Sequence, residues 1–470
     1  MSKINPSIFR GYDIRGVYPG DLNRAVVSRI TFAFAELYPL ATTIVVAHDT
    51  RKSSPVLAKA VSQALLRAGK KVIYLGVAPD PLFYFSIFHY GFDGGIMISG
   101  SHNPPKYNGL TLHIQKSGQK DKGDIVLKDL EKIRDLVIKG LRPPHKTRGK
   151  IISFDPLEDY LSSVTKKIKL ARPLKVVIDS GNGAMGYLPQ KVFEKLGCRV
   201  KTLYGEFDSS FPHHLPDPYI RENRLAAKKE VLKGKFDIGF VYDGDGDRVA
   251  AIDNKGRSVG GDFCLLMLAM QALAKYKGPI VHDARVSKAF LDEMEKRKVK
   301  TYFSISHHTA VIKKIVKTKA IFGGEVTLHF LFPKDYYLCD EALFASLKLA
   351  EIASRKNDFA GFVDSLPRYP ASPEVFIPCL DTKKFQIIKK LQDYLKASHY
   401  EFIDVDGARI NFSQGWALAR AANTTPYIKC RFEGKTKKDL KDIELKSLEI
   451  FRKVGIPITD KIYKELGLRS

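Results

Sequence analysis

The chain has 470 residues, of which 44% are hydrophobic and 27% charged, so its length and composition predict three or four globular domains. The longest apolar run, residues 263–270, is too short to cross a bilayer, and no signal peptide is recognisable at the N-terminus. Five scattered cysteines form no CxxC pair, which favours a reducing, cytoplasmic setting over disulfides or a zinc site.

The net charge of +26 has three interpretations: nucleic-acid binding, an anionic substrate, or a lysine-rich surface. The basic residues are spread along the chain and form no long arm. We therefore favour the surface interpretation and expect no nucleic-acid partner and no membrane partner.

The first 110 residues alternate between strands and helices. Asn23 can cap a helix whose apolar positions recur at helical spacing from Val26 to Leu37. A buried strand follows at 43–48, and Ser54-Pro55 begins a second helix that ends near Gly69. Further apolar strands at 71–75 and 95–99 predict a largely parallel sheet.

The same pattern recurs twice along the chain. A strand ends on an acidic residue at Asp49, again at Asp179 in 175–179, and again at Asp283 in 279–283. This recurrence predicts three related α/β units in series. Helices and strands between 385 and 453 predict a different, α+β module at the end of the chain.

The predicted domain boundaries follow a change of pattern near 150–156 and a proline-rich stretch at 367–378. The predicted fold class is α/β, with three related domains of mixed, largely parallel sheets and a C-terminal α+β domain around a central cleft. The four domains are expected at residues 1–150, 151–256, 257–368 and 369–470.

Residues 100–109 read GSHNPPKYNG and follow a predicted strand, so they lie at the sheet edge where open α/β folds bind ligands. Gly100 permits a tight turn, Ser101 is a candidate nucleophile, and His102 lies beside it. A solvated surface turn is the alternative interpretation. Adjacency in sequence does not make a catalytic triad, because triads form in space.

Residues 243–248 read DGDGDR, with carboxylates at alternate positions separated by glycines. Such carboxylates repel one another unless a cation lies among them, and their oxygens suit Mg²⁺. A calcium EF-hand is excluded, because its sixth position would be Arg248 and its twelfth Asn254. A magnesium ion here would suit phosphoryl transfer.

Three further segments carry weaker signals when each is taken alone. Residues 420–426 (RAANTTP) offer a guanidinium, hydroxyls and backbone N–H groups for a phosphate. In 323–329 (GGEVTLH), Glu325 and His329 could bind sugar hydroxyls, and 9–16 (FRGYDIRG) places two arginines around a turn. Polar loops and a surface hairpin are the alternatives.

Taken together and in this order, these segments resemble the α-D-phosphohexomutase family, in its phosphomannomutase/phosphoglucomutase branch. The segment 211–218 (FPHHLPDP) also resembles that branch, and the resemblance extends from Arg10 to Glu433. It implies four domains around one cleft, with a smaller last domain that closes over the substrate.

The resemblance also implies an enzyme, an intramolecular phosphotransferase of the isomerase class. In the family, the serine at the position of Ser101 carries a phosphate, converts a hexose monophosphate to a 1,6-bisphosphate, and takes the other phosphate back. The implied cofactor is one Mg²⁺, held by Ser101, Asp243, Asp245 and Asp247. The implied activator is glucose 1,6-bisphosphate or mannose 1,6-bisphosphate.

The family's pattern assigns the remaining site residues by position. Those beside the nucleophile, with Ser101 the catalytic set, are His102, Arg15 and Arg248. The substrate-binding set is Arg10, Tyr12, Lys106, Arg285, Glu325, Thr327, His329, Arg420, Asn423, Thr424 and Thr425. The expected partner is a small phosphosugar, and the chain is expected to be a monomer or a weak homo-oligomer.

The sequence departs from the family's pattern at substrate-facing positions. Thr111 replaces a lysine that is a general acid/base candidate, Leu328 replaces a glycine, Ala422 replaces a serine, and Arg285 stands where lysine is frequent. His102, His113 or Lys106 could take the acid/base role in place of that lysine.

Two alternatives therefore stay open. One is a mutase for another phosphosugar, such as an amino-sugar phosphate. The other is a catalytically weak phosphosugar-binding regulatory protein. The choice between mannose and glucose is not readable from the sequence.

Overall fold

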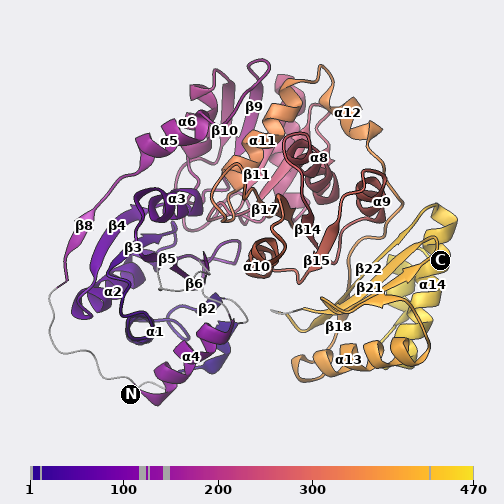
Figure 1. Ribbon diagram of the computed structural model, residues 1–470, viewed down its shortest axis with the longest axis horizontal. Helices are drawn as coiled ribbons and strands as arrows, with labels where there is room; N and C mark the ends of the chain where they lie inside the picture. Colours follow the sequence, from indigo (N-terminus) through magenta and orange to yellow (C-terminus); the bar gives the residue numbers. More distant parts are fainter. Residues whose placement is uncertain are drawn as a thin grey trace. The chain divides into compact units, whose positions relative to one another are not determined.

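A computed structural model describes residues 4–10, 13–115, 123–124, 127–140, 149–422 and 425–468 (Figure 1). The chain divides into two compact units, Met1–Gln271 with Thr327–Asp364, and Ala272–Val326 with Ser365–Ser470. No helix among the described residues is both long enough and apolar enough to cross a membrane.

The first unit begins with a mixed sheet. Its strands, in spatial order, are β1 (Phe9–Arg10), β2 (Asp13–Val17), β6 (Tyr107–Ile114), β5 (Gly94–Ile98), β3 (Thr43–His48), β4 (Lys71–Val77) and β8 (Ile151–Ser153), with β7 (Gly123–Asp124) paired to β6. Strands β5, β3, β4 and β8 are mutually parallel, whereas β1, β2 and β6 are antiparallel to their neighbours. The strands expected at 43–48, 71–75 and 95–99 are confirmed.

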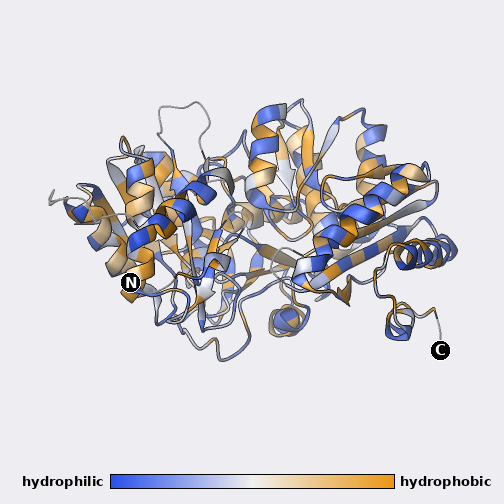
Figure 2. Cartoon of the chain, turned by 90° about the horizontal axis from the view of Figure 1, so that it is seen from below, coloured by the Kyte–Doolittle hydropathy of each residue, from blue (hydrophilic) through white to orange (hydrophobic). Residues whose placement is uncertain are grey.

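This sheet packs against helices, of which the two at 24–37 and 54–67 were predicted from the sequence. The elements are η1 (Pro6–Ile8), α1 (Arg24–Leu37), α2 (Ser54–Arg67), α3 (Asp80–Tyr90) and α4 (Leu127–Lys139). The Asn23 side chain accepts hydrogen bonds from the backbone of Ala25 and Val26, which confirms the predicted cap of α1. Figure 2 shows the resulting alternation of hydrophilic and hydrophobic residues along the helices.

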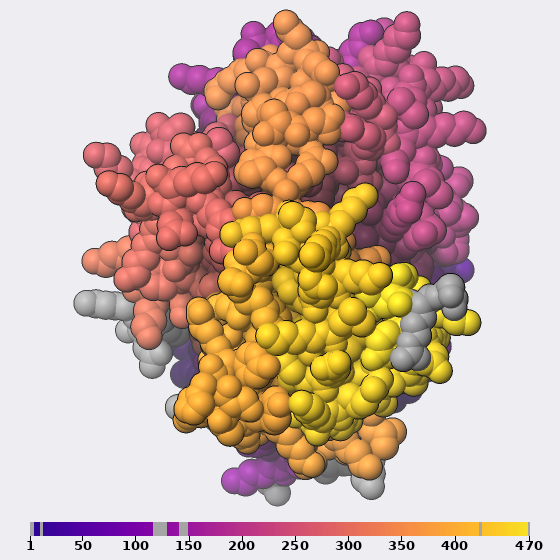
Figure 3. Space-filling view, turned by 90° about the vertical axis from the view of Figure 1, so that its right-hand side faces the viewer, coloured from indigo at the N-terminus to yellow at the C-terminus, as the bar shows by residue number. Residues whose placement is uncertain are grey.

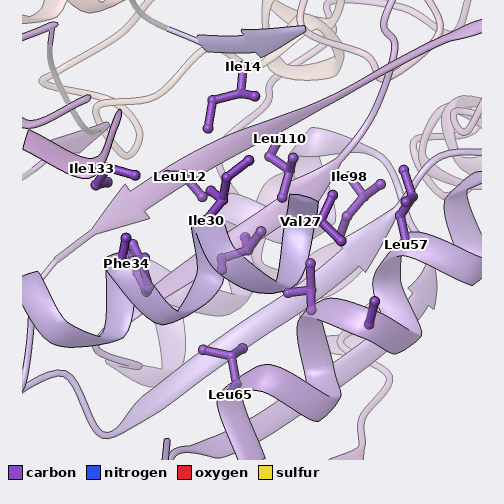
Figure 4. Packing of buried hydrophobic residues seen from close by; sticks show 14 of the residues in the cluster. Ile14, Val27, Ile30, Phe34, Leu57, Leu65, Ile98, Leu110, Leu112 and Ile133 are labelled. Atoms are coloured by element: carbon purple, nitrogen blue, oxygen red, sulfur yellow. The ribbon is translucent and has the colours of Figure 1, made fainter. Parts of the chain in front are cut away.

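The core beneath these helices is formed by aliphatic and aromatic side chains from helices and strands. Figure 4 shows Ile30 of α1 beside Leu112 of β6, with Phe34 further along the same helix, and Leu57 of α2 near Ile98. All of these side chains are buried. Each such side chain contributes about 1.5–3 kcal/mol when fully buried, so this core holds the strand ends that carry the site.

The second sheet of this unit follows the same plan. Its order is β10 (Arg199–Leu203), β9 (Lys175–Asp179), β11 (Ile238–Tyr242), β12 (Val249–Asp253) and β13 (Ser258–Val259). Strands β10, β9 and β11 are parallel, and β11 returns antiparallel into β12. The remaining elements are α5 (Leu157–Thr165), α6 (Leu188–Lys195), η2 (Glu222–Arg224), α7 (Leu225–Gly234), α8 (Gly261–Leu273), β17 (Phe330–Leu331), α11 (Ala342–Ser354) and α12 (Phe359–Ser365).

The second unit contains the third parallel arrangement and the C-terminal module. Strand β14 (Ile280–Asp283) lies between β15 (Thr301–Ser304) and β16 (Phe322–Gly324), parallel to both, with α9 (Lys288–Lys296) and α10 (His308–Thr318). The C-terminal sheet is antiparallel, in the order β18 (Val375–Pro378), β22 (Tyr427–Gly434), β21 (Gly415–Ala421), β20 (Ala408–Phe412) and β19 (Phe402–Ile403). Its helices are α13 (Asp381–Ala397), α14 (Lys437–Lys453) and α15 (Asp460–Glu465). Figure 3 shows this C-terminal part, coloured orange to yellow.

The C-terminal module differs in detail from the sequence-based expectation. The strand region around 401–412 is two short strands separated by a turn at Gly407, whose φ is 87°. A Cβ atom at Gly407 would lie 2.3 Å from the Ala419 carbonyl oxygen, so this turn requires glycine. Strand β21, which includes the first two residues of the 420–426 motif, was not predicted from the sequence.

Candidate active site

The serine loop joins β5 to β6 and places Ser101 in a strained backbone conformation. Ser101 has a φ of 46°, in the left-handed region, and is only 2% exposed. Its backbone N–H donates to Ser99 Oγ at 2.8 Å. Its own hydroxyl donates to Asp243 Oδ2 at 3.0 Å, and the same Oγ lies 3.1 Å from His102 Nδ1. Two motifs separated by 142 residues in sequence therefore meet at this hydroxyl.

The acidic loop turns between β11 and β12. Asp243 Oδ1 accepts hydrogen bonds from the backbone N–H groups of Gly246, Asp247 and Arg248, at 3.0, 3.0 and 3.2 Å. Gly246 has a φ of 84°, and a Cβ there would lie 2.2 Å from the Met185 sulfur. One oxygen of Asp243 thus folds the loop, while the other faces Ser101.

Three carboxylates of this loop lie in a buried setting that suits a cation. Asp243, Asp245 and Asp247 are 0%, 3% and 9% exposed. Burial and the neighbouring carboxylates raise the pKa of Asp243 well above its usual range, and burial and Asp247 raise that of Asp245. Within the described part of the chain, the buried Asp245 Oδ1 has no hydrogen-bond partner. A divalent cation would satisfy this oxygen and offset the repulsion, so the residues fit a magnesium site.

A fourth carboxylate lies beside this group and was not predicted. Asp80, at the start of α3, has an oxygen within 4.8 Å of ligand atoms of Asp245 and Asp247, and its backbone N–H donates to the Asp245 carbonyl at 2.7 Å. Nothing in the segment around Asp80 resembles a metal motif, so only the three-dimensional structure could reveal it.

Arg248 connects the acidic loop to two histidines. Its Nη1 lies 3.0 Å from His102 Nδ1, and its Nε donates to His329 Nε2 at 2.8 Å. Because Arg248 donates to Nε2, the proton of His329 lies on Nδ1, which is 3.4 Å from Asp340 Oδ2. Burial and the charges of Arg248 and Arg15 lower the pKa of His102 well below its usual range, so His102 is neutral and accepts hydrogen bonds.

Arg15 also contacts the serine loop. Its Nη1 donates to the Ser99 carbonyl at 2.7 Å and its Nε to Asp13 Oδ2 at 2.8 Å. Although burial opposes it, the charges of Asp13 and Asp245 raise the pKa of Arg15. Ser101 therefore lies near two arginines as well as the carboxylates.

Other residues predicted near the nucleophile are placed differently. Lys106 is exposed, with its Nζ 5.9 Å from the centre of the Tyr107 ring. His113 is buried, and its ring lies 5.4 Å from each of the rings of Tyr84 and Phe88, in the aromatic core. That setting makes His113 a poor replacement for an acid/base lysine. Thr111 lies in β6 opposite Met97.

The predicted sugar and phosphate residues are divided between the units. In the second unit, Arg285 Nη2 lies 3.4 Å from Glu325 Oε2. Arg420 Nη1 lies 3.2 Å from Asp406 Oδ2, and Arg420 Nε is buried without a hydrogen-bond partner in the described part of the chain. Thr327 and His329 belong to the first unit. Tyr12, Asn423 and Thr424 lie outside the described residues, and the side chain of Arg10 is also not described.

The phosphate loop is held by a lysine that the sequence did not reveal. Lys384 of α13 is 2% exposed. Its ammonium group donates hydrogen bonds to the carbonyls of Ala422 and Thr425, the second at 2.9 Å. A lysine on a charged helix carries no signal of this kind. Arg51 was also missed, although it follows Asp49 at the end of a buried strand, where a functional position could have been suspected.

Family models match all four regions of the chain: phosphoglucomutase/phosphomannomutase α/β/α domain I at residues 6–140, domain II at 158–256, domain III at 260–369 and the C-terminal domain at 375–449. The chain belongs to the phosphoglucomutase/phosphomannomutase family. The resemblance inferred from the motifs is thereby confirmed, as are the three α/β domains and the C-terminal domain of the predicted fold class.

Individual relatives agree with this family assignment. A phosphomannomutase/phosphoglucomutase from Pseudomonas putida is 32% identical over 454 residues, covering 95% of each chain. A phosphoglucomutase from Neisseria gonorrhoeae is 29% identical, covering 94% of this chain and 96% of its own. The crystal structure of a family member from Burkholderia thailandensis superimposes with a TM-score of 0.88 at 29% identity, over 97% of this chain and 99% of the other.

Proposed function

We propose that this chain is a phosphohexomutase that interconverts hexose 1-phosphates and hexose 6-phosphates, with mannose, glucose or both as the sugar. The observation that carries the proposal is the Ser101 hydroxyl, 3.0 Å from Asp243 in a loop of three buried carboxylates. Family membership and the names of the similar enzymes support the same activity.

In the proposed reaction, Ser101 carries a phosphate. A free hydroxyl of the bound sugar monophosphate attacks this phosphorus, the bond from phosphorus to Ser101 Oγ breaks, and a 1,6-bisphosphate forms. The intermediate reorients, and its other phosphate returns to Oγ. In the net step the proton of the attacking hydroxyl ends on Oγ, and His102 Nδ1, 3.1 Å from Oγ, is a group that can pass a proton to it.

The surrounding charges suit this transfer. Arg15 and Arg248, whose side chains are 16% and 19% exposed, supply two cations near the phosphoryl group, whose charge must be stabilised during transfer. One Mg²⁺, bound by Ser101, Asp243, Asp245 and Asp247, would neutralise phosphoryl oxygens when present. A bisphosphate, either glucose 1,6-bisphosphate or mannose 1,6-bisphosphate, would restore phosphoserine after any hydrolysis.

Further residues are proposed to bind the parts of the substrate that are not transferred. Arg420, with Asn423, Thr424 and Thr425, would bind the phosphate that is not transferred, and Arg285 and Glu325 would contact sugar hydroxyls. The buried Nε of Arg420 has no hydrogen-bond partner among the described residues, and this supports the role, because a bound phosphate oxygen would satisfy it. Thr327 and His329 are also proposed to contact the sugar.

The test is mutase turnover on mannose 1-phosphate and glucose 1-phosphate, with Mg²⁺ and a catalytic amount of glucose 1,6-bisphosphate. Ser101→Ala runs in parallel with the wild-type protein, and turnover should disappear in the variant. The ratio of the two wild-type rates would identify the preferred sugar. Glucosamine 1-phosphate serves as a third substrate, and turnover on it alone would mean that the substrate is an amino-sugar phosphate. Binding without turnover on any of the three would support a regulatory protein.

A further inference from the structure

We propose that Arg51 is the positioning residue of the serine loop, and that its guanidinium holds Ser101 in the conformation that transfers phosphate. This inference rests on the proposed mutase function for its kinetic consequences. Its structural basis is independent of the substrate, because every contact involved lies within the first unit.

Every N–H group of the Arg51 guanidinium donates a hydrogen bond, either to a carbonyl of the serine loop or to Asp49. Nη1 donates to the carbonyls of Pro104 and Tyr107, at 2.6 and 3.0 Å. Nη2 donates to the carbonyls of Ser101 and Asn103, at 2.8 and 2.6 Å. The Nε donates to Asp49 Oδ2 at 2.9 Å. A guanidinium has five N–H donors, and all five are satisfied here.

The packing around Arg51 leaves no room for another arrangement. Arg51 is 1% exposed, and a Cβ atom at Gly100 would lie 2.3 Å from its Cζ, so the glycine is needed for the guanidinium to fit. The Phe211 ring lies 5.3 Å from Cζ. Asp49, which anchors Nε, also accepts the Gly100 backbone N–H at 2.8 Å.

These contacts have a direct consequence for the nucleophile. Holding the Ser101 carbonyl at one end fixes the left-handed backbone at φ 46°, which directs Oγ toward Asp243. Such a conformation is unfavourable for a serine and persists only when its surroundings impose it. An ammonium has three donors and no planar fork, so lysine at this position cannot hold four carbonyls.

The test uses Arg51→Lys, with Arg285→Lys as the matched comparison. Misplacement of a reacting group by 1 Å can cost about 100-fold in rate, so kcat of Arg51→Lys should fall by about that factor while KM changes less than about threefold. The rate at which glucose 1,6-bisphosphate phosphorylates Ser101, followed by intact mass, should fall in parallel. Arg285→Lys should instead raise KM.

A second readout does not depend on turnover. Backbone amides in the peptide covering residues 99–108 should exchange hydrogen at least about tenfold faster in Arg51→Lys, while peptides of β11 and α7 keep their protection. If the wild-type protein turns over no phosphosugar, the proposed function fails, and this exchange measurement still decides whether Arg51 orders the loop.

The proposal is overturned if Arg51→Lys keeps kcat within about threefold or leaves exchange in 99–108 unchanged. Should Arg51→Lys fail to melt cooperatively, Asp49→Asn replaces it, because it weakens the anchor of Nε and leaves the loop carbonyls in place. That variant should lower kcat in the same direction, and an unchanged kcat would also overturn the proposal.

Discussion

The first and third α/β domains share an Asp-x-Arg sequence at the end of a buried strand and use it differently. Asp49 and Arg51 follow β3, whereas Asp283 is the last residue of β14 and Arg285 follows it. In both pairs the arginine Nε donates to Oδ2 of the aspartate, at 2.9 and 2.6 Å. Both arginines are almost fully buried, at 1% and 4% exposure.

The two pairs differ in what the rest of the guanidinium contacts. Arg51 donates to four carbonyls of the serine loop, whereas Nη2 of Arg285 lies near two carboxylates, those of Asp283 and Glu325. The carbonyls of a buried loop cannot be replaced by a ligand, so all of the Arg51 hydrogen bonds to them stabilise the loop. A carboxylate is a partner that a phosphate or a sugar hydroxyl can replace, so Arg285 is suited to contact substrate.

The largest difference should appear when each aspartate is removed. Asp49→Ala leaves the buried Arg51 without its counter-ion and also removes acceptors for Ser99 Oγ and the Gly100 N–H. Breaking a buried ion pair in this way costs about 3–5 kcal/mol of unfolding free energy. Asp283→Ala should cost less, about 1–3 kcal/mol, because Glu325 stays near Arg285.

Urea denaturation, followed by fluorescence and by circular dichroism, measures both losses. The two probes are needed because a chain of four domains need not unfold in one step. Asp49→Asn and Asp283→Asn serve as controls that keep the side-chain volume. Equal losses for the two alanine variants would contradict the distinction between the pairs.

A smaller effect is expected from Glu325→Gln. The substitution removes one of the two carboxylates near Arg285 and leaves the serine loop unchanged. If Glu325 binds a sugar hydroxyl, loss of its charge should raise KM about tenfold, equivalent to about 1.4 kcal/mol of binding, with kcat changed far less. Steady-state kinetics on the preferred sugar phosphate measures this. A fall in kcat at constant KM would place Glu325 in the transfer step instead.

The sequence predicted the repeated α/β domains, but not the different contacts of Arg51 and Arg285. The apolar strands and their terminal acids predicted repeated α/β domains, because the strand period and the strand ends are local features. The family resemblance implied that Asp243 and Ser101 hold the same magnesium ion. The role of Arg51 depends on carbonyls 50 to 56 residues away, and carbonyls are common to all residues, so no sequence pattern reports them.

The two units also contain buried carboxylates whose titration should differ. Burial raises the pKa of Glu341 in the first unit to about 8, and that of Glu444 in the second to about 7. In each case the folded state binds the proton more tightly than the unfolded state. The stability that each protonated carboxyl supplies is therefore present below the ordinary pKa near 4.5 and is lost as pH rises through the raised value.

Stability should fall between pH 5 and pH 8, by up to about 1.4 kcal/mol per pH unit for Glu341. Glu341→Gln keeps an acceptor for the Phe344 N–H, the cap of α11, and should flatten the pH dependence of the urea midpoint. Glu444→Gln should also flatten the pH dependence of the urea midpoint, but only up to about pH 7, whereas the effect of Glu341→Gln extends to about pH 8. Unchanged pH profiles in both variants would show that neither carboxyl takes up a proton on folding.

The smallest expected effect is a difference in stability between two variants of Leu328, another residue of the candidate site with a strained backbone. Like Ser101, Leu328 has a left-handed backbone, with a φ of 78°, but no guanidinium holds it among the described residues. Its side chain is 3% exposed, so the free energy gained by burying the leucine side chain offsets the cost of the strained backbone.

Leu328→Ala keeps the strained backbone and loses the buried leucine side chain, which costs about 2–5 kcal/mol of unfolding free energy. Leu328→Gly loses the same burial but relieves about 1–2 kcal/mol of strain. The glycine variant should thus be the more stable of the two by about 1 kcal/mol, measured from urea midpoints, although glycine is normally less favourable than alanine. An alanine variant equal to or more stable than the glycine variant would mean that the backbone relaxes at this position.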